Sequence, residues 1–323
     1  MKRVIKPEGK FNIAIDDVPI PEPGSDEVRI KAVCSLISRG SELGARYTRE
    51  YAVNPDIMGY SMAGTIDAVG EGIGHLAIGD RVVALAPHAE YTIRSAKVSG
   101  PTDLAWVVPL LPGLSFDEAP YYPLVASAVT WVEIEQIQPQ DTVVILGQGL
   151  VGSLVLQVAR AAGNGRFIAV DTLPGRCALA EEFGADVVIN ASAEEAVKAV
   201  RRLTNGIGAE LVIYAVGGPA GPAAFEQGLD MLSTGGTLHL LGLYEDQALP
   251  LSSGKIQRRR LIGGHYGLSN GARQSLKALE LIASGAIHTK RMTTHRFPFT
   301  EAAAAFDLLY HHPDEAFGVL LDW

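Results

Sequence analysis

The chain has 323 residues, about two domains' worth, which excludes a single small binding module. Apolar residues make up 47% and charged residues 20%, proportions typical of a folded globular protein rather than of a disordered chain. Because 27 Lys and Arg stand against 36 Asp and Glu, the net charge is −9, and a nucleic-acid partner is not expected.

The number of cysteines and the length of the apolar stretches indicate the cellular location of the protein. Cys34 and Cys177 are too few for a disulfide framework, and the first ten residues lack the apolar core of a secretion signal. The apolar stretches are interrupted by Gly, Pro, Gln or charged residues before they reach the ~18 residues of a membrane span. We therefore predict a cytoplasmic protein that does not cross a membrane.

The first part of the chain reads as short strands that end at Gly and Asp turns. Residues 26–33, 63–74 and 79–93 alternate Val, Ile and Thr with polar residues, a pattern that predicts a β-rich first unit.

From Asp141 onward, apolar strands alternate with long helical stretches. The predicted strands are 141–147, 166–171, 185–190, 209–217 and 235–243, and the predicted helices between them are 150–163, 173–184 and 193–204. This alternation favours βαβ units in a doubly wound parallel sheet, whose strands are buried on both faces. After it, residues 273–285 and 296–312 have helical spacing, and 317–323 reads as a strand that rejoins the first unit.

A glycine motif marks a dinucleotide site. Gly147, Gly149 and Gly152 follow a predicted strand and begin a predicted helix, where they permit a tight turn, approach to a pyrophosphate and close helix packing. Asp171 ends the next strand 19 residues after Gly152, where a carboxylate can accept both ribose hydroxyls. Because that carboxylate would repel the 2′-phosphate of NADP, NAD is the expected cofactor. Glycines that merely close a βα turn are the alternative, and Arg176 lies either near the adenine or on the surface.

These segments together resemble the medium-chain dehydrogenase/reductase superfamily over essentially the full chain. The match lies in residues 63–82 of the first unit and in 147–163, 168–171, 213–218 and 235–243. The resemblance implies an α/β protein: a GroES-like β-rich catalytic domain plus a Rossmann doubly wound parallel-sheet domain. It places the catalytic domain at 1–123, completed by 265–323, and the Rossmann domain at 124–264. By analogy it also implies a homodimer or homotetramer.

The sequence departs from the zinc members of that family at each metal ligand. Ser38 stands where they carry a Cys, Tyr60 and Ser61 replace their His and Glu, and Tyr122-Pro123 offers neither carboxylate nor thiol. We therefore expect no metal. The stretches 35–42, 59–64 and 87–91 resemble a zinc-lacking branch that includes bacteriochlorophyllide hydroxyethyl dehydrogenase and dehydrogenase modules of polysaccharide gene contexts.

Without zinc, side chains must handle the alcohol proton. The resemblance gives Ser41 the position of the family's proton-relay residue, Glu42 that of an acid near the metal, and Tyr60 that of a lost ligand. The alternatives are a turn serine, a buried acid paired with Arg39, and a tyrosine that fills the vacated volume. Two histidines, His88 and His265, are further catalytic candidates, and a structural role is the favoured interpretation of each.

The residues expected at the cofactor lie in the glycine motif and at the carboxyl ends of later strands, where such sheets bind ligands. Besides the three glycines, Asp171 and Arg176, they are Leu150, Val151, Val216, Gly217, Leu241, Gly242 and Leu243. Thr130, in the helix before the cofactor domain, either contacts the nicotinamide or packs at the domain junction.

The expected function is hydride transfer, without zinc, between NAD and a small-molecule secondary alcohol or ketone. An enoyl or quinone reductase of the same fold is a second interpretation, against which Asp171 counts because those relatives usually prefer NADP. A catalytically idle NAD(H)-binding protein is a third.

Overall fold

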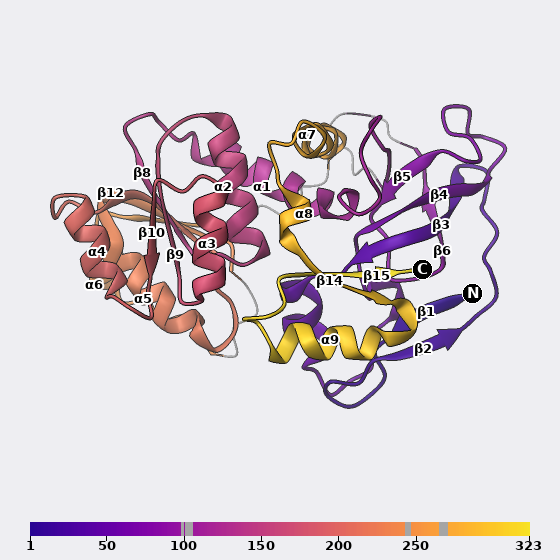
Figure 1. Cartoon of the computed structure of the whole chain (residues 1–323), viewed down its shortest axis with the longest axis horizontal. Coiled ribbons are helices and arrows are strands. Elements are labelled where there is room, and N and C mark those ends of the chain that lie inside the picture. The colour runs from indigo at the N-terminus through magenta and orange to yellow at the C-terminus, as the bar shows by residue number, and fades with distance from the viewer. Residues whose placement is uncertain (98–99, 101–105, 243–246, 265–270) are drawn as a thin grey trace. The chain divides into compact units, whose positions relative to one another are not determined.

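The computed structural model describes residues 1–97, 100, 106–242, 247–264 and 271–323. The chain divides into two compact units (Figure 1): unit 1 is residues 1–129 with 267–323, and unit 2 is residues 130–266. The first boundary falls inside helix α1 (Tyr122–Glu135), whereas the family resemblance placed it between residues 123 and 124.

Unit 1 is built on a seven-stranded mixed sheet. In spatial order its strands are β14 (Thr293–Pro298), β15 (Gly318–Asp322), β3 (Glu27–Leu36), β4 (Met62–Val69), β5 (Arg81–Ala84) and β7 (Val107–Pro109), with β6 (Tyr91–Ser95) paired to β3. Only β14 and β15 among these pairs run parallel. Because β15 pairs with β3, the C-terminal tail does rejoin the first unit.

The remaining elements of unit 1 are a hairpin and several helical segments. A hairpin joins β1 (Lys2–Ile5) to β2 (Ala14–Asp17). The helical elements are a π-helix η1 (Arg39–Tyr47), the 3-10 turns η2 (Pro55–Ile57), η3 (Ala119–Tyr121) and η5 (Phe299–Glu301), and helices α7 (Ala272–Ala283), α8 (Thr289–Met292) and α9 (Ala302–His311).

Helix α9 holds η1 in place. Its buried residues Ala302, Ala305, Phe306 and Leu309 follow the spacing of one helix face, and this apolar stripe packs in the same core as Leu43 of η1. The π-helix that carries Ser41 and Glu42 therefore packs against α9.

Unit 2 is a six-stranded sheet whose pairs are all parallel. In spatial order the strands are β10 (Val187–Asn190), β9 (Arg166–Asp171), β8 (Thr142–Leu146), β11 (Ala209–Tyr214), β12 (Leu232–Leu240) and β13 (Arg260–Gly263). The order counted along the unit is 3-2-1-4-5-6, which is the doubly wound order of dinucleotide-binding sheets. The chain reverses direction across the sheet between β8 and β11, and ligands of such sheets bind there.

Helices connect these strands. They are α2 (Leu150–Ala162), α3 (Pro174–Glu182), α4 (Ala196–Leu203), the 3-10 turn η4 (Gly218–Ala220), α5 (Gly221–Met231) and α6 (Ser253–Ile256). Strands β8 and β9 are almost entirely buried, as their unbroken Val, Ile and Leu content predicts. The predicted fold class, a β-rich unit plus a doubly wound parallel-sheet unit, is confirmed.

One local prediction is wrong. Residues 296–298 were expected at the start of a helix, yet they end strand β14, and α9 begins only at Ala302. Pairing of β14 with β15 keeps the segment extended up to Pro298, whose ring lacks an N–H. The segment around Ser41, for which a turn was one interpretation, forms the π-helix η1. Among the described residues no helix has both the length and the apolar character needed to cross a bilayer.

Candidate active site

Two hydroxyl groups in unit 1 meet at positions where the zinc members of the resembled family carry their metal ligands. Ser38 directly precedes η1, and Tyr60 lies between η2 and β4. The phenol of Tyr60 donates a hydrogen bond to Ser38 Oγ at 2.9 Å. The structure therefore brings together two of the positions that the family resemblance singled out.

Behind this pair lies a buried carboxylate. Glu42 is 0% exposed, and its Oε1 accepts the backbone N–H of Ser38 at 2.8 Å. Its Oε2 lies 2.8 Å from Nε2 of His88, which is also 0% exposed. Glu42 and His88 were named from the sequence separately, and the structure shows them as partners.

The histidine continues the network to the C-terminus of the chain. His88 Nδ1 lies 2.8 Å from Ser35 Oγ, and Trp323 Nε1 donates to the same oxygen at 2.9 Å. Every group is satisfied when Glu42 is ionised, His88 is neutral with its proton on Nε2, and the Ser35 hydroxyl donates to Nδ1. A buried network that is satisfied in this way holds its members in one geometry.

The remaining catalytic candidates stand outside this network. Ser41 is half-buried on η1, and no side-chain hydrogen bond links it to Glu42 or His88 within the described part of the chain. Arg39 donates to the carbonyl of Leu309 at 2.8 Å. His265 lies outside the described residues.

The residues at the family's other ligand positions, Ser61 and Tyr122, do not form a zinc-binding site either. Ser61 donates its hydroxyl to the carbonyl of Pro120, and burial raises the pKa of the Tyr122 phenol. Nearby Cys34 bonds the carbonyl of Phe116 at 3.0 Å, and burial raises the pKa of its thiol to about 12. Zinc sites are built from thiolates, imidazoles and carboxylates, and these hydroxyls and this thiol stay protonated. In the described ranges no three His, Cys, Asp or Glu residues gather where they could hold a metal.

A pocket of about 340 Å³ opens beside Tyr60 in unit 1. The pocket is lined by residues of η1, η2 and β6 and of the segments between η2 and β4, after β5 and before β7: Arg46, Asp56, Ile57, Gly59, Tyr60, Leu85, Ala86, Arg94 and Trp106. Tyr60 therefore contacts both this pocket and the hydroxyl of Ser38. Sequence reasoning missed Arg46, Arg94 and Trp106 because they are separated along the chain and belong to no motif.

The glycine turn in unit 2 has the geometry that pyrophosphate binding needs. Gly147 has a φ of +94°, and a Cβ at Gly152 would stand 1.8 Å from the carbonyl oxygen of Gly147, so neither position accepts a side chain. A Cβ at Gly149 would meet nothing within 4 Å. Gly149 thus faces open space at the N-terminus of α2, where the first N–H groups, from Leu150 and Val151, lack partners within the helix.

Asp171 lies beside this turn at the end of β9. Its Oδ2 accepts the N–H of Gln148 at 2.7 Å, and its Oδ1 accepts the N–H of Leu173 at 2.9 Å. Arg176 Nη1 is 3.9 Å from Oδ2. The carboxylate is thus oriented by the turn itself, and a dinucleotide is a ligand that this arrangement fits.

The later cofactor candidates gather at the carboxyl ends of β11 and β12. Leu241 and Gly242 both donate their backbone N–H to the carbonyl of Tyr214, and a Cβ at Gly242 would lie 2.1 Å from the carbonyl of Val216. Gly217 directly follows Val216 and caps η4. Thr130 is buried on α1, and Leu243 lies outside the described residues.

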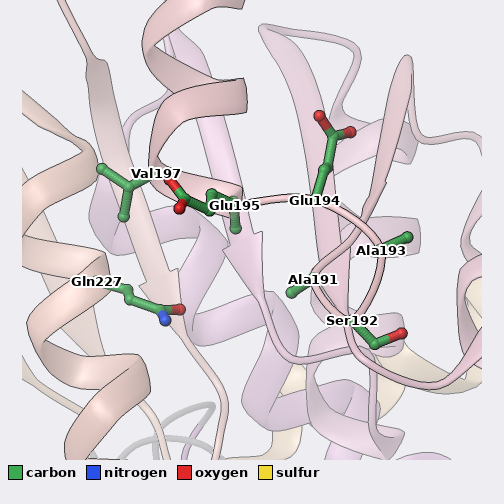
Figure 2. A pocket seen from close by; sticks show the side chains of 8 residues that line it. Ala191, Ser192, Ala193, Glu194, Glu195, Val197 and Gln227 are labelled. Atoms are coloured by element: carbon green, nitrogen blue, oxygen red, sulfur yellow. The ribbon is translucent and has the colours of Figure 1, made fainter.

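A second pocket, of about 460 Å³, lies elsewhere in unit 2 (Figure 2). It is lined by the segment 191–197 and by Gln227 of α5, and by none of the cofactor candidates. Its two carboxylates are already paired, Glu194 with Arg202 and Glu195 with Lys198, so it presents no unsatisfied charge to a ligand.

Comparison with known proteins places the chain among dehydrogenases. Residues 24–107 match the model of the alcohol dehydrogenase GroES-like domain, and residues 151–284 match the model described as zinc-binding dehydrogenase. The sorbitol dehydrogenase of Bacillus subtilis (strain 168) is 27% identical, over 96% of this chain and 94% of its own. The L-threonine 3-dehydrogenase of the same organism is 28% identical, over 96% and 95%. The structure of an alcohol dehydrogenase from Thermus sp. ATN1 superposes with a TM-score of 0.82 at 28% identity, and covers 100% of this chain and 99% of that one.

Proposed function

We propose that this chain, which belongs to the alcohol dehydrogenase-like medium-chain dehydrogenase/reductase superfamily, transfers a hydride between NAD(H) and a secondary alcohol or ketone without a catalytic zinc ion. Membership of the superfamily and the dehydrogenase relatives make it an oxidoreductase that acts on alcohols. The choice of NAD, the absence of zinc and the residue roles are our proposal.

The observation that carries the proposal is the bond between Tyr60 and Ser38. Because the phenol of Tyr60 donates to Ser38 Oγ, its oxygen keeps lone pairs that can accept the O–H of an alcohol in the adjoining pocket. In the reverse reaction the phenol can turn to donate to a ketone oxygen. Tyr60 thereby orients the reacting oxygen, and Ser38 holds the phenol in place, while the alcohol proton leaves to water in the open pocket as the hydride is transferred.

Glu42 has a positioning role in this scheme. Its carboxylate accepts the backbone N–H of Ser38, not the hydroxyl, so it holds the turn that presents Ser38. His88 in turn fixes the other oxygen of Glu42. We propose this positioning role in place of direct acid or base work by Glu42, because its carboxylate contacts the backbone N–H of Ser38 and is completely buried.

Unit 2 would hold the dinucleotide, which when bound supplies the hydride donor or acceptor. The open space at Gly149 and the N–H groups of Leu150 and Val151 fit the pyrophosphate. Asp171 would accept the ribose hydroxyls and repel a 2′-phosphate, which favours NAD.

The test measures turnover of secondary alcohols with NAD⁺, and of ketones, enones and quinones with NADH, for the wild type and Tyr60→Phe. We expect alcohol and ketone turnover, and Tyr60→Phe should lower kcat by about 10²–10⁴-fold while NADH affinity stays unchanged. Tyr51→Phe, at a side chain that is 62% exposed, is the matched control.

Three results would contradict the proposal in different ways. Turnover of enones or quinones alone would indicate a reductase of the same fold. NADH binding without turnover of any compound would indicate an idle binding protein. Full kcat in Tyr60→Phe would remove Tyr60 from the chemistry.

A further inference from the structure

The pocket beside Tyr60 is lined by two arginines. Arg46 comes from η1 and Arg94 from β6, and the indole of Trp106, the carboxylate of Asp56 and the phenol of Tyr60 complete the polar part of the lining. Of these residues, the mechanism proposed above uses only Tyr60. We call the space lined by these residues the arginine pocket.

Arg46 carries a buried donor that is not satisfied. Its Nη1 is shielded from solvent and finds no hydrogen-bond partner among the residues that the structure describes. A buried guanidinium nitrogen without an acceptor is costly, because the N–H has lost water and gained nothing in exchange. Because Arg46 lines the pocket, an anion bound there would offset the charge of this poorly satisfied guanidinium.

Arg94 is held rigidly at the same pocket. Its Nε donates to the carbonyl of Leu85 at 2.6 Å and its Nη1 to that of Ile93 at 2.7 Å, and neither bond uses Nη2. The guanidinium carbon lies 5.7 Å from the ring centre of Trp106. Burial lowers the pKa of Arg94, which means that its positive charge is poorly solvated and gains from a counter-charge.

Asp56 offsets only part of this charge. It is exposed at the pocket, and its charge acts on Arg94 against the effect of burial. Two guanidinium groups against one carboxylate leave one net positive charge in a pocket of about 340 Å³. A pocket of this size can hold a small metabolite.

We propose that the substrate is an alcohol that also carries an anionic group, a carboxylate or a phosphate ester, which binds Arg46 and Arg94 while the hydroxyl meets Tyr60. Planar guanidinium groups suit both kinds of anion, because they present paired donors to paired oxygens. This inference rests on the proposed function for the role of Tyr60, whereas the anion site itself does not depend on turnover.

The experiment has a binding arm and a kinetic arm on the full chain. Calorimetry measures binding of inorganic phosphate, sn-glycerol 3-phosphate and 3-hydroxybutyrate, with glycerol and 2-butanol as uncharged counterparts. NAD-linked turnover is then compared for the same charged and uncharged alcohols. The variants are Arg46→Gln and Arg94→Gln, and Arg49→Gln, at an exposed residue just beyond η1, is the matched control. Circular dichroism and thermal melts verify that each variant is folded.

We expect the charged probes to bind more tightly than their counterparts. Loss of a charge-assisted contact in Arg46→Gln should weaken their binding about 10- to 100-fold, and should leave uncharged probes and the Arg49→Gln protein unaffected. The two charged organic probes separate a phosphate preference from a carboxylate preference.

Several outcomes would overturn the inference. Equal binding of charged and uncharged probes would do so, as would binding of charged probes that survives in both folded arginine variants. Should Arg94→Gln fail to fold, Arg46→Gln alone decides. Arginine-dependent anion binding without turnover of any alcohol would support the anion site and defeat the proposed function, so the two failures are distinguishable.

Discussion

Replacement of Glu42 by Gln tests whether the buried network supports the candidate site. The carboxylate accepts two charge-assisted hydrogen bonds, from Ser38 N and His88 Nε2, and is 0% exposed. An amide keeps one acceptor oxygen and turns an NH₂ group toward the other donor, so one bond is lost and one becomes a neutral bond.

The expected cost follows from these two bonds. A lost charge-assisted bond and a weakened one together amount to about 2–4 kcal/mol in the free energy of unfolding. At about 2–4 °C per kcal/mol for a unit of this size, the melting temperature should fall by on the order of 5–15 °C. A conformational change of the Ser38 turn would also lower kcat, because Ser38 pairs with Tyr60.

Denaturant titration and thermal melts measure the effect against Glu50→Gln. The Glu50 side chain is 73% exposed and lies 3.8 Å from Lys10, so that replacement should cost less than about 0.5 kcal/mol. A double-mutant cycle with His88→Phe isolates the interaction between Glu42 and His88. If Glu42→Gln unfolds at the same denaturant concentration as Glu50→Gln, our account of the network is refuted.

Three further predictions concern the cofactor turn and the buried thiol. Gly149→Ala should fold normally and lose most NADH affinity, because its methyl group enters the open space where the pyrophosphate would bind. Gly152→Ala should disrupt the turn, since its Cβ would stand 1.8 Å from the carbonyl oxygen of Gly147. NADH fluorescence titration and thermal melts separate the two variants, and equal behaviour would contradict the prediction. NAD(H) should bind at least about 10-fold better than NADP(H), and Asp171→Ser should relax the preference; equal affinities in the wild type would show that Asp171 does not select the cofactor. Burial raises the pKa of the Cys34 thiol to about 12, so its alkylation, followed by mass spectrometry, should be slow in the folded protein at mildly alkaline pH. The thiol ionises at lower pH in the unfolded chain than in the folded protein, so the stability that protonated Cys34 contributes is complete below the unfolded pKa and is lost as pH rises toward 12. Fast labelling of the folded protein would contradict the burial of Cys34.

The parts that sequence predicted well depend on short-range patterns. The parallel sheet follows from apolar strands that alternate with helices, and the glycine turn follows from residues within one strand–turn–helix segment. Asp171 belongs to the same group, because the end of the next strand lies beside that turn in any doubly wound sheet.

The buried network could not be predicted in the same way. Trp323 reaches Ser35, 288 residues earlier, because β15 pairs with β3 in a register that sets Leu321 opposite Ser35. The sequence showed Arg39 as the nearest cation to Glu42, whereas the fold brings His88, 46 residues further along, against the carboxylate. Pairings of this kind depend on strand register, which local sequence does not specify.

The central claim, hydride transfer without zinc, is tested most directly by metal analysis of active enzyme. The purified protein is dialysed against a strong chelator, and its zinc content is measured by inductively coupled plasma mass spectrometry. NAD-linked alcohol turnover is assayed on the same sample. Our account predicts full turnover with far less than one zinc ion per chain. About one zinc ion per chain, with turnover that disappears on its removal and returns on its addition, would contradict it.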